Sequence, residues 1–515
     1  MRNLQIRQWS PWLLALALTT PPLGADELRR QVNAKTVIRP APAAMCALLD
    51  DPAKVRVMDG LLFNLAWSCD RLEFLGPVPA AVDGPVTRGV EGEPDVQVND
   101  DTGGSETTQS ETTIAQNEVT GTLCSGFNDS CEMFCPGGGG GFTGFARSID
   151  GGLTWDDRGA VGGESVGDPS VVWRRSDGFF YYATLRSGGG LALYRSTDDC
   201  QTFSFFGAPE TGVADKELLA VDNWPQSPHF GNLYIAYLGG GMVARRSTDG
   251  GANWSAPVSL GTGQGAWPMV APNGDVFVSW GSSGSGTVTI PISRSTDGGV
   301  SFTPLPNVIT DQVQPRDATA TNDCERDALN GNIRYLASPQ LATTDDGVLH
   351  VVYSYDPDGL DMGDVVDVFY RRSTDSGATW SSELRLNDDA TTNDQYFPTL
   401  SANGSTVLAT WYDRRLDPAN LLQDTFRRVS TDGGLTWGPN ERLSDVSTPI
   451  EFDTIALPCY HGDYDQNVVT ADGSTVAQWS DDRNAGEVAD VFTEIAGAGL
   501  LFADGFETGD TSAWE

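Results

Sequence analysis

Positive charge is scarce in this chain of 515 residues. It contains 32 Lys and Arg residues against 70 Asp and Glu residues, which gives a formal net charge of −38. A surface this acidic repels nucleic acids and anionic lipids, so we expect neither as a partner. The same charge repels acidic sugars, and a site for one would therefore need a local cluster of arginines.

Long apolar runs are also missing, apart from one near the N-terminus. Residues 12–18 form this run; two arginines precede it, and a small-residue cleavage site follows at residues 23–25. This arrangement predicts a signal peptide over residues 1–25, whose apolar segment is too short to span a bilayer. We expect an exported, soluble monomer, extracellular or periplasmic, without a transmembrane segment.

Histidine is rare as well, with three residues in the chain. His350 alternates with apolar residues inside a predicted strand, which indicates packing against a neighbouring element. His461 lies in a predicted loop and is the histidine with the strongest claim to a functional role.

The eight cysteines are an even number, which in an exported chain favours disulfides. Cys46 and Cys69 both lie in the N-terminal segment, and we expect them to pair. Cys124, Cys131 and Cys135 lie close together, but they lack the spacing of paired CxxC knuckles and have no histidine nearby. A zinc site is therefore not expected there.

Glycine and proline are plentiful, at 59 and 29 residues, as expected for many short strands joined by tight turns. One motif recurs six times: a serine, any residue, an aspartate, two residues that are mostly glycine, and a terminal Trp or Phe. Its aspartates lie 48 to 78 residues apart, about the size of one four-stranded blade. We call these segments the aspartate turns; they contain Asp150, Asp198, Asp249, Asp297, Asp375 and Asp432.

The physics of an aspartate turn is local. Its carboxylate can accept hydrogen bonds from backbone N–H groups of the same turn. Glycine supplies the positive-φ conformations that such a turn needs, and the terminal aromatic side chain can pack between strands. Six copies with the same residue types in register predict a repeated β-hairpin unit.

The motif resembles the repeat Ser-x-Asp-x-Gly-x-Thr-Trp of the Asp-box, or BNR-repeat, β-propellers of the sialidase-like superfamily. The resemblance covers residues 95–497. It implies an all-β propeller and a sialidase-like exo-glycosidase that hydrolyses terminal sugars, acidic ones included. Because similar turns occur in propellers with other functions, the alternative is a non-catalytic extracellular propeller that binds glycans or proteins.

The number of blades follows from the strands around the aspartate turns. A seventh unit comes after the last turn, at residues 474–493, and lacks a fourth strand. Residues 95–100 have the pattern of the fourth strands elsewhere, so we expect them to complete this blade and close the ring, which removes an exposed sheet edge. This predicts seven four-stranded blades; six, the number in sialidases, is the alternative.

The same patterns divide the chain into segments. Residues 26 to 92 contain an apolar stretch that looks partly helical. We therefore expect a signal peptide at 1–25, a partly helical N-terminal extension at 26–92, the propeller at 93–497 and a C-terminal tail at 498–515.

Functional side chains should gather on one rim of the ring. The aspartate turns join third to fourth strands, so the loops between second and third strands and those between blades lie on the opposite face. These loops carry arginine, tyrosine and carboxylate side chains, which are the types that a sialidase uses. We therefore expect the functional site on the rim opposite the aspartate turns.

The resemblance implies three chemical roles at that rim. Arginines hold a substrate carboxylate through bidentate bonds, a tyrosine activated by a glutamate attacks the anomeric carbon, and an aspartic acid protonates the leaving oxygen. Each candidate also has a structural alternative, because Asp–Arg and Tyr–Asp pairs in such loops can tie neighbouring blades together. The candidates are Arg186, Arg334, Arg415 and Arg483 for the clamp, Tyr396 or Tyr464 as nucleophile, Glu217 as its base, and Asp168 or Asp463 as acid.

No cofactor is required by this chemistry. Asp356, Asp358 and Asp361 form a loose group of oxygen ligands, so Ca²⁺ is an optional ligand there, although the terminal Glu and flanking helices of an EF-hand are missing. A solvated acidic loop is the alternative. The expected partner of the protein is a carbohydrate or glycoconjugate.

Overall fold

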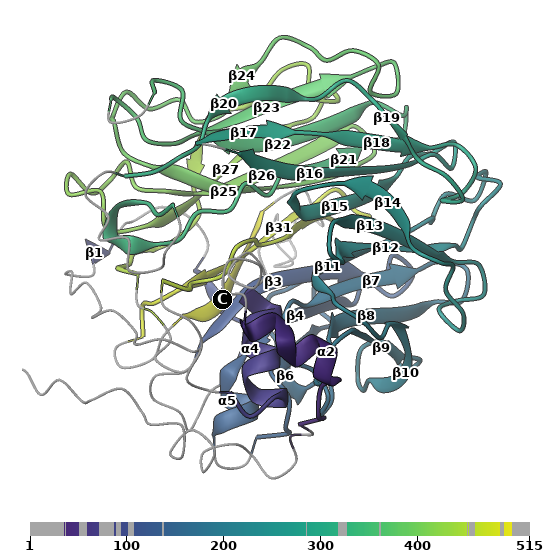
Figure 1. Ribbon diagram of the computed structural model, residues 1–515. Helices are drawn as coiled ribbons and strands as arrows, with labels where there is room; N and C mark the ends of the chain where they lie inside the picture. The colour runs from purple at the N-terminus through teal and green to yellow at the C-terminus, as the bar shows by residue number, and fades with distance from the viewer. Residues whose placement is uncertain are drawn as a thin grey trace, which may run out of the picture.

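The computed structural model describes residues 36, 38–50, 59–71, 87–88, 94–100, 108–135, 138–284, 286–317, 327–359, 362–450, 452, 459–484 and 489–496 (Figure 1). Nearly all regular structure in these residues is β, and it forms seven four-stranded blades around a central axis. The all-β, seven-bladed propeller predicted from the sequence is confirmed.

Blades 1 to 6 pair their strands in chain order, beginning at the axis, and blade 7 adds β2 from the start of the propeller as its fourth strand. Blades 1 to 3 contain β3 (Gln109–Gln116), β4 (Leu123–Asp129), β5 (Thr143–Ser148) and β6 (Asp156–Ala160); β7 (Ser170–Arg174), β8 (Phe179–Leu185), β9 (Leu191–Ser196) and β10 (Ser204–Glu210); and β11 (Asp215–Val221), β12 (Leu233–Leu238), β13 (Met242–Ser247) and β14 (Val258–Gly261). Blades 4 to 7 contain β15 (Gln264–Val270), β16 (Val276–Gly284), β18 (Ile292–Ser295) and β19 (Thr303–Pro304); β21 (Gln340–Thr343), β22 (Leu349–Tyr355), β23 (Asp367–Ser373) and β24 (Leu384–Arg385); β25 (Gln395–Asn403), β26 (Thr406–Asp413), β27 (Asp424–Ser430) and β28 (Glu441–Arg442); and β30 (Asn467–Val469), β31 (Thr475–Asp481), β32 (Asp490–Ala496) and β2 (Val96–Gln97).

The first strands of the blades line the axis. Each of them contacts the first strand of the next blade, from β3 through β7, β11, β15, β21 and β25 to β30, and β30 contacts β3 again. Polar side chains strengthen these contacts: Thr113 Oγ1 accepts a hydrogen bond from the amide of Val171 at 3.0 Å, and Ser170 Oγ accepts one from the amide of Leu219 at 2.9 Å. The first strands therefore surround the central axis, and hydrogen bonds connect them between neighbouring blades.

Apolar side chains fill the space between blades. Val352 and Tyr370 of blade 5 pack in one cluster with the fully buried Trp411 of blade 6. Strand residues alternate between the two faces of a blade, so each blade contributes to two such interfaces. Truncating one of these large side chains to alanine would cost about 3–5 kcal/mol.

The N-terminal strand closes the ring, as predicted. Val96 and Gln97 of β2 lie opposite Thr493 and Phe492 of β32, and the amide of Val98 donates to the carbonyl of Val491 at 2.8 Å. Blade 7 thus takes its fourth strand from the other end of the propeller chain. This pairing covers the edge of β32, which would otherwise be open to other strands.

The six aspartate turns share one hydrogen-bond pattern. In the first, Asp150 accepts bonds from Ser148 Oγ at 2.8 Å, from the amide of Thr154 at 3.0 Å and from Thr154 Oγ1 at 2.6 Å. Ser148 Oγ in turn accepts a bond from the amide of Gly152 at 2.8 Å. The glycines adopt positive φ, 78° at Gly151 and 101° at Gly152, because the turn requires the left-handed region.

The turn in blade 2 departs from this composition. Asp199 and Cys200 replace the two glycines, and both have φ of 62°. Cys200 forms a disulfide with Cys124 of blade 1, and Asp199 accepts hydrogen bonds from Asn117 at 2.7 Å and Thr122 at 2.6 Å. Two residues strained by a left-handed backbone are therefore held by contacts to the neighbouring blade.

Two further disulfides are described. Cys46 and Cys69 pair, as the sequence analysis predicted. Cys131 pairs with Cys135 across α5 (Ser130–Phe134), a short helix in the loop between β4 and β5. The cysteines at 124, 131 and 135 are thus all in disulfides.

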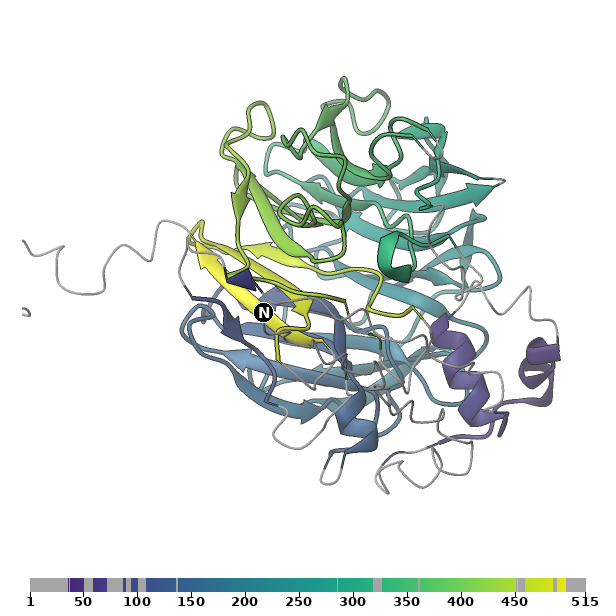
Figure 2. The ribbon, with the colours of Figure 1, turned by 90° about the vertical axis from the view of Figure 1, so that its left-hand side faces the viewer.

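The N-terminal extension places helices on one face of the ring (Figure 2). It contains α2 (Ala43–Cys46), the 3₁₀ helix η1 (Ala47–Asp50) and α4 (Asp59–Ser68). Additional short elements are β17 (Thr287–Ile290) and β20 (Ile309–Val313) beside blade 4, β1 (Thr87–Arg88) paired with β29 (Val446–Ser447), and η3 (Asn330–Asn332).

None of the described helices is long and apolar enough to cross a membrane. The expected signal peptide and the expected C-terminal tail both lie outside the described residues.

Candidate functional site

The ring has two faces, and the direction of the strands determines which loops lie on each face. We call the face with the aspartate turns and the first-to-second-strand turns the turn face. The opposite face, with the second-to-third-strand loops and the connections between blades, is the rim face. The central axis ends differently on the two faces.

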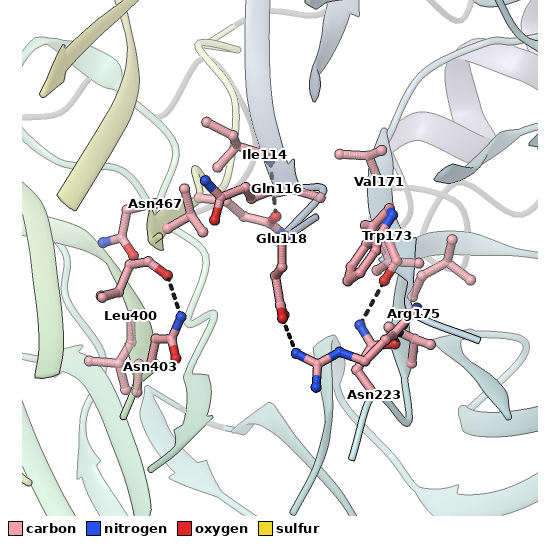
Figure 3. Close-up of a pocket in the computed structure, with 18 of the residues that line it drawn as sticks. Ile114, Gln116, Glu118, Val171, Trp173, Arg175, Asn223, Leu400, Asn403 and Asn467 are labelled. Atoms are coloured by element: carbon pink, nitrogen blue, oxygen red, sulfur yellow. Dashed lines mark hydrogen bonds and ion pairs between the residues drawn. The ribbon is translucent and has the colours of Figure 1, made fainter. Parts of the chain in front are cut away.

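A cavity occupies the axis on the side of the turn face (Figure 3). Its volume is about 440 Å³. Residues from the first strands form its wall, among them Ile114, Leu218 and Leu400, and residues from the first-to-second-strand turns surround its mouth. The exposed side chains of Glu118 and Arg175 form an ion pair at this mouth, which is drawn in Figure 3. We call this space the axial cavity.

Three tryptophans contribute to the lining of the axial cavity. Trp267 and Trp224 donate through Nε1 to backbone carbonyls, to Leu341 at 3.1 Å and to Val270 at 2.9 Å. These bonds hold the two indole rings in place. Trp173, the third, is buried. Tryptophan rings present large flat apolar faces, which suit the C–H faces of a ligand.

Amide side chains supply the polar part of the lining. Gln466 Oε1 accepts bonds from Thr113 Oγ1 at 2.9 Å and from the amide of Ile114 at 3.3 Å, which fixes its position. Asn467 donates to Thr410 Oγ1 at 3.0 Å, while its buried Oδ1 has no hydrogen-bond partner within the described part of the chain. These bonds fix both amide side chains in the wall of the cavity.

The other end of the axis is filled by charged side chains. Lys216 Nζ forms ion pairs with Glu111, at 3.4 Å, and with Asp463. Arg334 donates two hydrogen bonds to Asp463, from Nε to Oδ1 at 2.9 Å and from Nη2 to Oδ2 at 2.6 Å. These residues come from blades 1, 3 and 7 and from the connection before blade 5, and side chains from blades so far apart can meet only near the axis.

We call this group the axial hub. All of its members are buried, with exposed fractions of 6% or less. Asp168 belongs to it because its Oδ2 accepts a bond from the amide of Lys216 at 2.9 Å. The axial hub comprises Glu111, Asp168, Lys216, Glu217, Arg334, Tyr460, Asp463 and Tyr464.

Three residues of the axial hub have a strained backbone. Glu111, Asp168 and Lys216 have φ of 52°, 54° and 50°, and they lie at the start of the first strand in three consecutive blades. Blade 4 has Gly265 near the same point, at φ 65°, beside a register shift in the β15–β16 pairing. Non-glycine residues are uncommon at such φ values. The same conformation recurs at Phe397 of blade 6 (φ 46°), again beside a register shift, so it is a repeated β-bulge of the first strands.

Burial shifts the pKa values of the carboxyl groups in the hub. Burial, together with the charges of Asp168 and Asp463, raises the pKa of Glu111 well above its usual range despite the opposing charge of Lys216. Burial also raises the pKa of Asp168, to which Glu111 is hydrogen-bonded. Burial alone would lower the pKa of Lys216, but the carboxylates of Asp463, Glu111 and Asp168 raise it overall.

The structure brings five of the nine predicted catalytic and clamp residues into the hub: Asp168, Glu217, Arg334, Asp463 and Tyr464. The hydroxyl of Tyr464 donates to the carbonyl of Pro169 at 3.3 Å. Burial and the nearby carboxylates of Glu111, Asp168 and Glu217 raise the pKa of Tyr464 well above its usual value. Ionisation of this tyrosine, which nucleophilic attack would need, is therefore disfavoured in this arrangement.

Tyr396 lies apart from the hub. It is fully buried, its hydroxyl donates to Gln423 Oε1 at 2.8 Å, and the guanidinium of Arg414 lies 5.1 Å from the centre of its ring. Burial raises the pKa of Tyr396. Packing and hydrogen bonding within blade 6 therefore account for the position of Tyr396.

The other three arginines of the predicted clamp are each paired with different carboxylates. Arg186 Nε lies 2.8 Å from Glu164. Arg415 binds Asp413 at 2.7 Å and Asp388 at 2.9 Å, and Arg483 binds Asp481 and, at 2.6 Å, Asp95. Each guanidinium also lies over a phenylalanine ring, at 5.2, 4.4 and 3.8 Å from the centre. The three arginines do not converge on one point with Arg334.

Sequence reasoning did not select Glu111, Lys216 or Tyr460 as candidates, nor the tryptophans of the axial cavity. Asn128 Nδ2 donates to the hydroxyl of Tyr460, and the guanidinium of Arg334 lies 4.5 Å from the centre of the Tyr460 ring. The sequence contains one signal for three of the hub residues, which is their position. Glu111, Asp168 and Lys216 each lie just before the first strand of a blade or within its first residues.

His461 forms a second buried polar pair on the same side of the ring. Its Nε2 lies 2.7 Å from Asp482 Oδ2. Burial alone would lower the pKa of His461, but the carboxylate of Asp482 raises it overall. The pair links the loop after residue 459 to the loop after β31.

The predicted calcium ligands lie in the loop after β22. Asp356 Oδ1 accepts bonds from the amides of Asp358 at 3.1 Å and Gly359 at 2.8 Å, while Asp361 lies outside the described residues. Among the residues that the structure describes, no group of three or more His, Cys, Asp or Glu side chains is arranged to hold a metal ion.

The chain has weak similarity to known proteins. No family model and no curated protein matches the sequence. Among solved structures, the chain is similar to a protein of unknown function from Dyadobacter fermentans, with 17% identity, a TM-score of 0.41, and coverage of 64% of this chain and 95% of that one. It is also similar to a leech intramolecular trans-sialidase, with 12% identity, a TM-score of 0.41, and coverage of 64% of this chain and 68% of that one. A third similar structure is an α-L-arabinanase from Penicillium chrysogenum, with 15% identity, a TM-score of 0.37, and coverage of 62% of this chain and 94% of that one. These likenesses are weak in sequence and in shape, and they assign the chain to no family.

Proposed function

We propose that this chain is an exported glycan-binding propeller whose axial cavity receives a neutral, hydroxyl-rich sugar. The observation that carries the proposal is the lining of that cavity, in which Trp173, Trp224 and Trp267 stand beside amide side chains. Aromatic faces accept the apolar side of a sugar ring, and amides can both donate to and accept from its hydroxyls.

The size of the axial cavity fits this ligand class. Ligand pockets usually enclose about 300–1,000 Å³. The cavity of about 440 Å³ would hold a small part of a glycan. The amide side chains of Gln466 and Asn467 are among the polar groups of its lining.

Charge favours a neutral ligand over an acidic one. The formal net charge of −38 repels anions, and Arg175 at the mouth is already paired with Glu118. A sialidase of the kind that the aspartate turns resemble needs several arginines around one carboxylate, whereas Arg186, Arg415 and Arg483 are engaged elsewhere. These observations support glycan binding over sialic acid cleavage.

Export is part of the proposal. The N-terminal sequence has the pattern of a signal peptide, and three disulfides are described. Disulfides persist mainly in oxidising compartments, which fits a protein that acts outside the cytoplasm.

The proposal can be tested by titrating the mature protein with neutral oligosaccharides chosen from a glycan array. Trp224→Ala should weaken binding at least about tenfold, a loss of about 1.4 kcal/mol. Trp380→Ala is the matched control, because Trp380 belongs to an aspartate turn and does not line the axial cavity. Equal loss of binding in both variants, or unchanged binding in Trp224→Ala, would argue against the axial cavity as the site.

A further inference from the structure

The charged side chains of the axial cavity all lie at its mouth. They are Glu118, Arg175 and Asp345, and each comes from the turn between the first and second strands of its blade. The rest of the lining is apolar or carries amides. Among the described residues that line the cavity, Arg175 is therefore the single cation, and two carboxylates stand against it. A charged group on an entering sugar meets these three side chains first.

The backbone of Arg175 is fixed, whereas its guanidinium remains accessible. The Arg175 amide donates to Asn223 Oδ1 at 2.8 Å, and Asn223 Nδ2 donates to the carbonyl of Trp173 at 2.7 Å. The guanidinium pairs with Glu118 of the neighbouring blade, as Figure 3 shows, and the arginine side chain is 39% exposed. The turn therefore holds Arg175 at the mouth without burying the group that binds anions.

The adjacent arginine has a structural role, and its contacts are different. Arg174 donates through Nε to the carbonyl of Gly231 at 2.6 Å, pairs with Asp177, and is 14% exposed. In the guanidinium of Arg175, only Nη2 has a hydrogen-bond partner among the described residues. Its other N–H groups can donate to a ligand. Arg175 is thus the arginine of this turn that is suited to bind a ligand anion.

Asp345 adds a second carboxylate to the mouth. Its Oδ1 accepts a bond from the amide of Gly404 at 3.1 Å, and its own amide donates to the carbonyl of Gly404 at 3.1 Å. These bonds fix Asp345 between blades 5 and 6, and they do not neutralise its charge. A sugar carboxylate at the mouth would therefore be repelled by both Asp345 and Glu118.

The pair of Glu118 and Arg175 has little value for the fold. Both side chains are exposed, and exposed ion pairs contribute little to stability. A ligand carboxylate, by contrast, depends on this pair, because Glu118 occupies the cation that such a ligand needs. Binding sites obtain specificity in part from groups that disfavour the wrong ligand, and Glu118 has the position of such a group.

We propose that Glu118 is the specificity-determining residue of the axial cavity. By pairing with Arg175 it excludes sugars that carry a carboxylate and leaves the cavity to neutral glycans. Without Glu118, the free guanidinium and the tryptophan faces form a site for a uronic acid. The proposal rests on glycan binding in the axial cavity and names the group that selects among glycans there.

The test compares ligands that differ by one carboxylate. The reference is a neutral oligosaccharide that binds the mature protein. Its acidic counterparts are the same oligosaccharide with one sugar, the terminal one or the next, oxidised to a uronic acid. Calorimetric titration gives the acidic-to-neutral ratio of affinities for the acidic form that binds more tightly. Glu118→Gln should raise this ratio about tenfold, because it frees a charged hydrogen-bond donor. Adding Arg175→Gln to that variant should remove the gain.

Glu441→Gln is the matched control. It makes the same substitution with the same change in charge, and Glu441 is also an exposed partner of an arginine, Arg427, at 2.7 Å. Glu441 lies on β28 and does not line the cavity. The ratio should therefore keep its parent value in this variant. The gain in Glu118→Gln should remain measurable at about 1 M salt, where a screening length of about 3 Å removes repulsion by the rest of the protein.

Three results would overturn the proposal. An unchanged ratio in Glu118→Gln would show that Glu118 does not select against carboxylates. An equal rise in Glu118→Gln and Glu441→Gln, or a gain that disappears at high salt, would assign the selectivity to the net charge of the protein. A gain that survives Arg175→Gln would remove the assigned cation.

Failure of this proposal can be distinguished from failure of glycan binding. Neutral binding that depends on Trp224, together with an unchanged ratio in Glu118→Gln, would overturn the role of Glu118 alone. If no neutral oligosaccharide binds, glycan binding in the axial cavity is wrong and the role of Glu118 is wrong with it.

Discussion

The guanidinium of Arg334 and the carboxylate of Asp463 form a doubly hydrogen-bonded pair that is almost completely enclosed in the centre of the ring. Asp463 lies next to blade 7, and Arg334 precedes blade 5. The pair therefore joins parts of the ring that share no strand pairing. Lys216 from blade 3 binds the same carboxylate and extends the connection across the axis.

Removal of Arg334 should destabilise the whole propeller. Arg334→Met leaves Asp463 and its neighbours in a buried cluster with one cation fewer, and breaking a buried pair typically costs about 3–5 kcal/mol. Urea unfolding followed by tryptophan fluorescence measures this loss. Arg158→Met is the control, because Arg158 pairs with Asp156 near the surface, where ion pairs contribute about 0–1 kcal/mol. Equal effects of the two substitutions would mean that the hub pair has no special role in stability.

Stability should fall as pH rises from about 5 to 8, in part because of Glu494. Burial raises the pKa of Glu494 from 4.5 to about 8, helped by Asp95, Asp445 and Glu441 and opposed by Arg427. The folded state then holds a proton that the unfolded state releases first, so the free energy of unfolding declines across this interval. Glu494→Gln should flatten the decline in a series of melting curves.

The corresponding control for this pH series is Asp156→Asn, at an exposed position on β6. It should keep the parent slope between pH 5 and 8. A Glu494→Gln variant with the parent slope would place the titrating group elsewhere in the protein.

The blade 2 turn offers a test of backbone strain that is independent of the hub. Without its disulfide partner, Cys200 still occupies a position with φ of 62°. The double variant Cys124→Ala, Cys200→Gly should therefore be more stable than Cys124→Ala, Cys200→Ala by about 0.5–1 kcal/mol, because glycine adopts this φ without strain. Calorimetric melting of the two variants makes the comparison, and the opposite order would contradict the strain assignment.

Ring closure by β2 can be checked by truncation. A chain that begins at residue 101 loses the strand that pairs with β32, and should melt at a lower temperature and self-associate through the open edge. A chain that begins at residue 94 keeps β2 and is the control. Light scattering and melting curves distinguish the two. Identical behaviour of both truncated chains would show that the N-terminal strand contributes little to closure.

The fold could be predicted because its signals are local. Asp150 bonds to residues two and four positions away in its own turn, so the sequence motif contains the whole structural unit. The pairing of Val96 with Thr493 is distant in sequence, but residues 95–100 repeat the pattern of the other fourth strands. The number of blades follows from these two features together.

The sites were harder to predict because they form where distant strands meet. Lys216 finds its partners 105 and 247 residues away, at Glu111 and Asp463, and no spacing in the sequence indicates this meeting. The clamp arginines were predicted from their residue type and their position in loops of the rim face, and neither feature shows which carboxylates they pair with. Arg415 and Asp413 lie two positions apart and satisfy one another locally, so the same pair fits a structural role.

The tryptophans of the axial cavity could not be predicted from the sequence for the same reason. Trp173, Trp224 and Trp267 come from three blades, and each of them alone resembles an ordinary core residue. Their positions around the cavity depend on the register of three first strands and their turns. Only the assembled ring brings them around one space.

The most direct measurement of the central claim is an NMR titration of the indole N–H signals with a neutral oligosaccharide that binds the mature protein. Glycan binding in the axial cavity predicts saturable shifts for the signals of Trp173, Trp224 and Trp267, with those of Trp380 and Trp437 unchanged. Shifts confined to tryptophans outside the cavity, or no shift at a sugar concentration that saturates binding, would contradict the account.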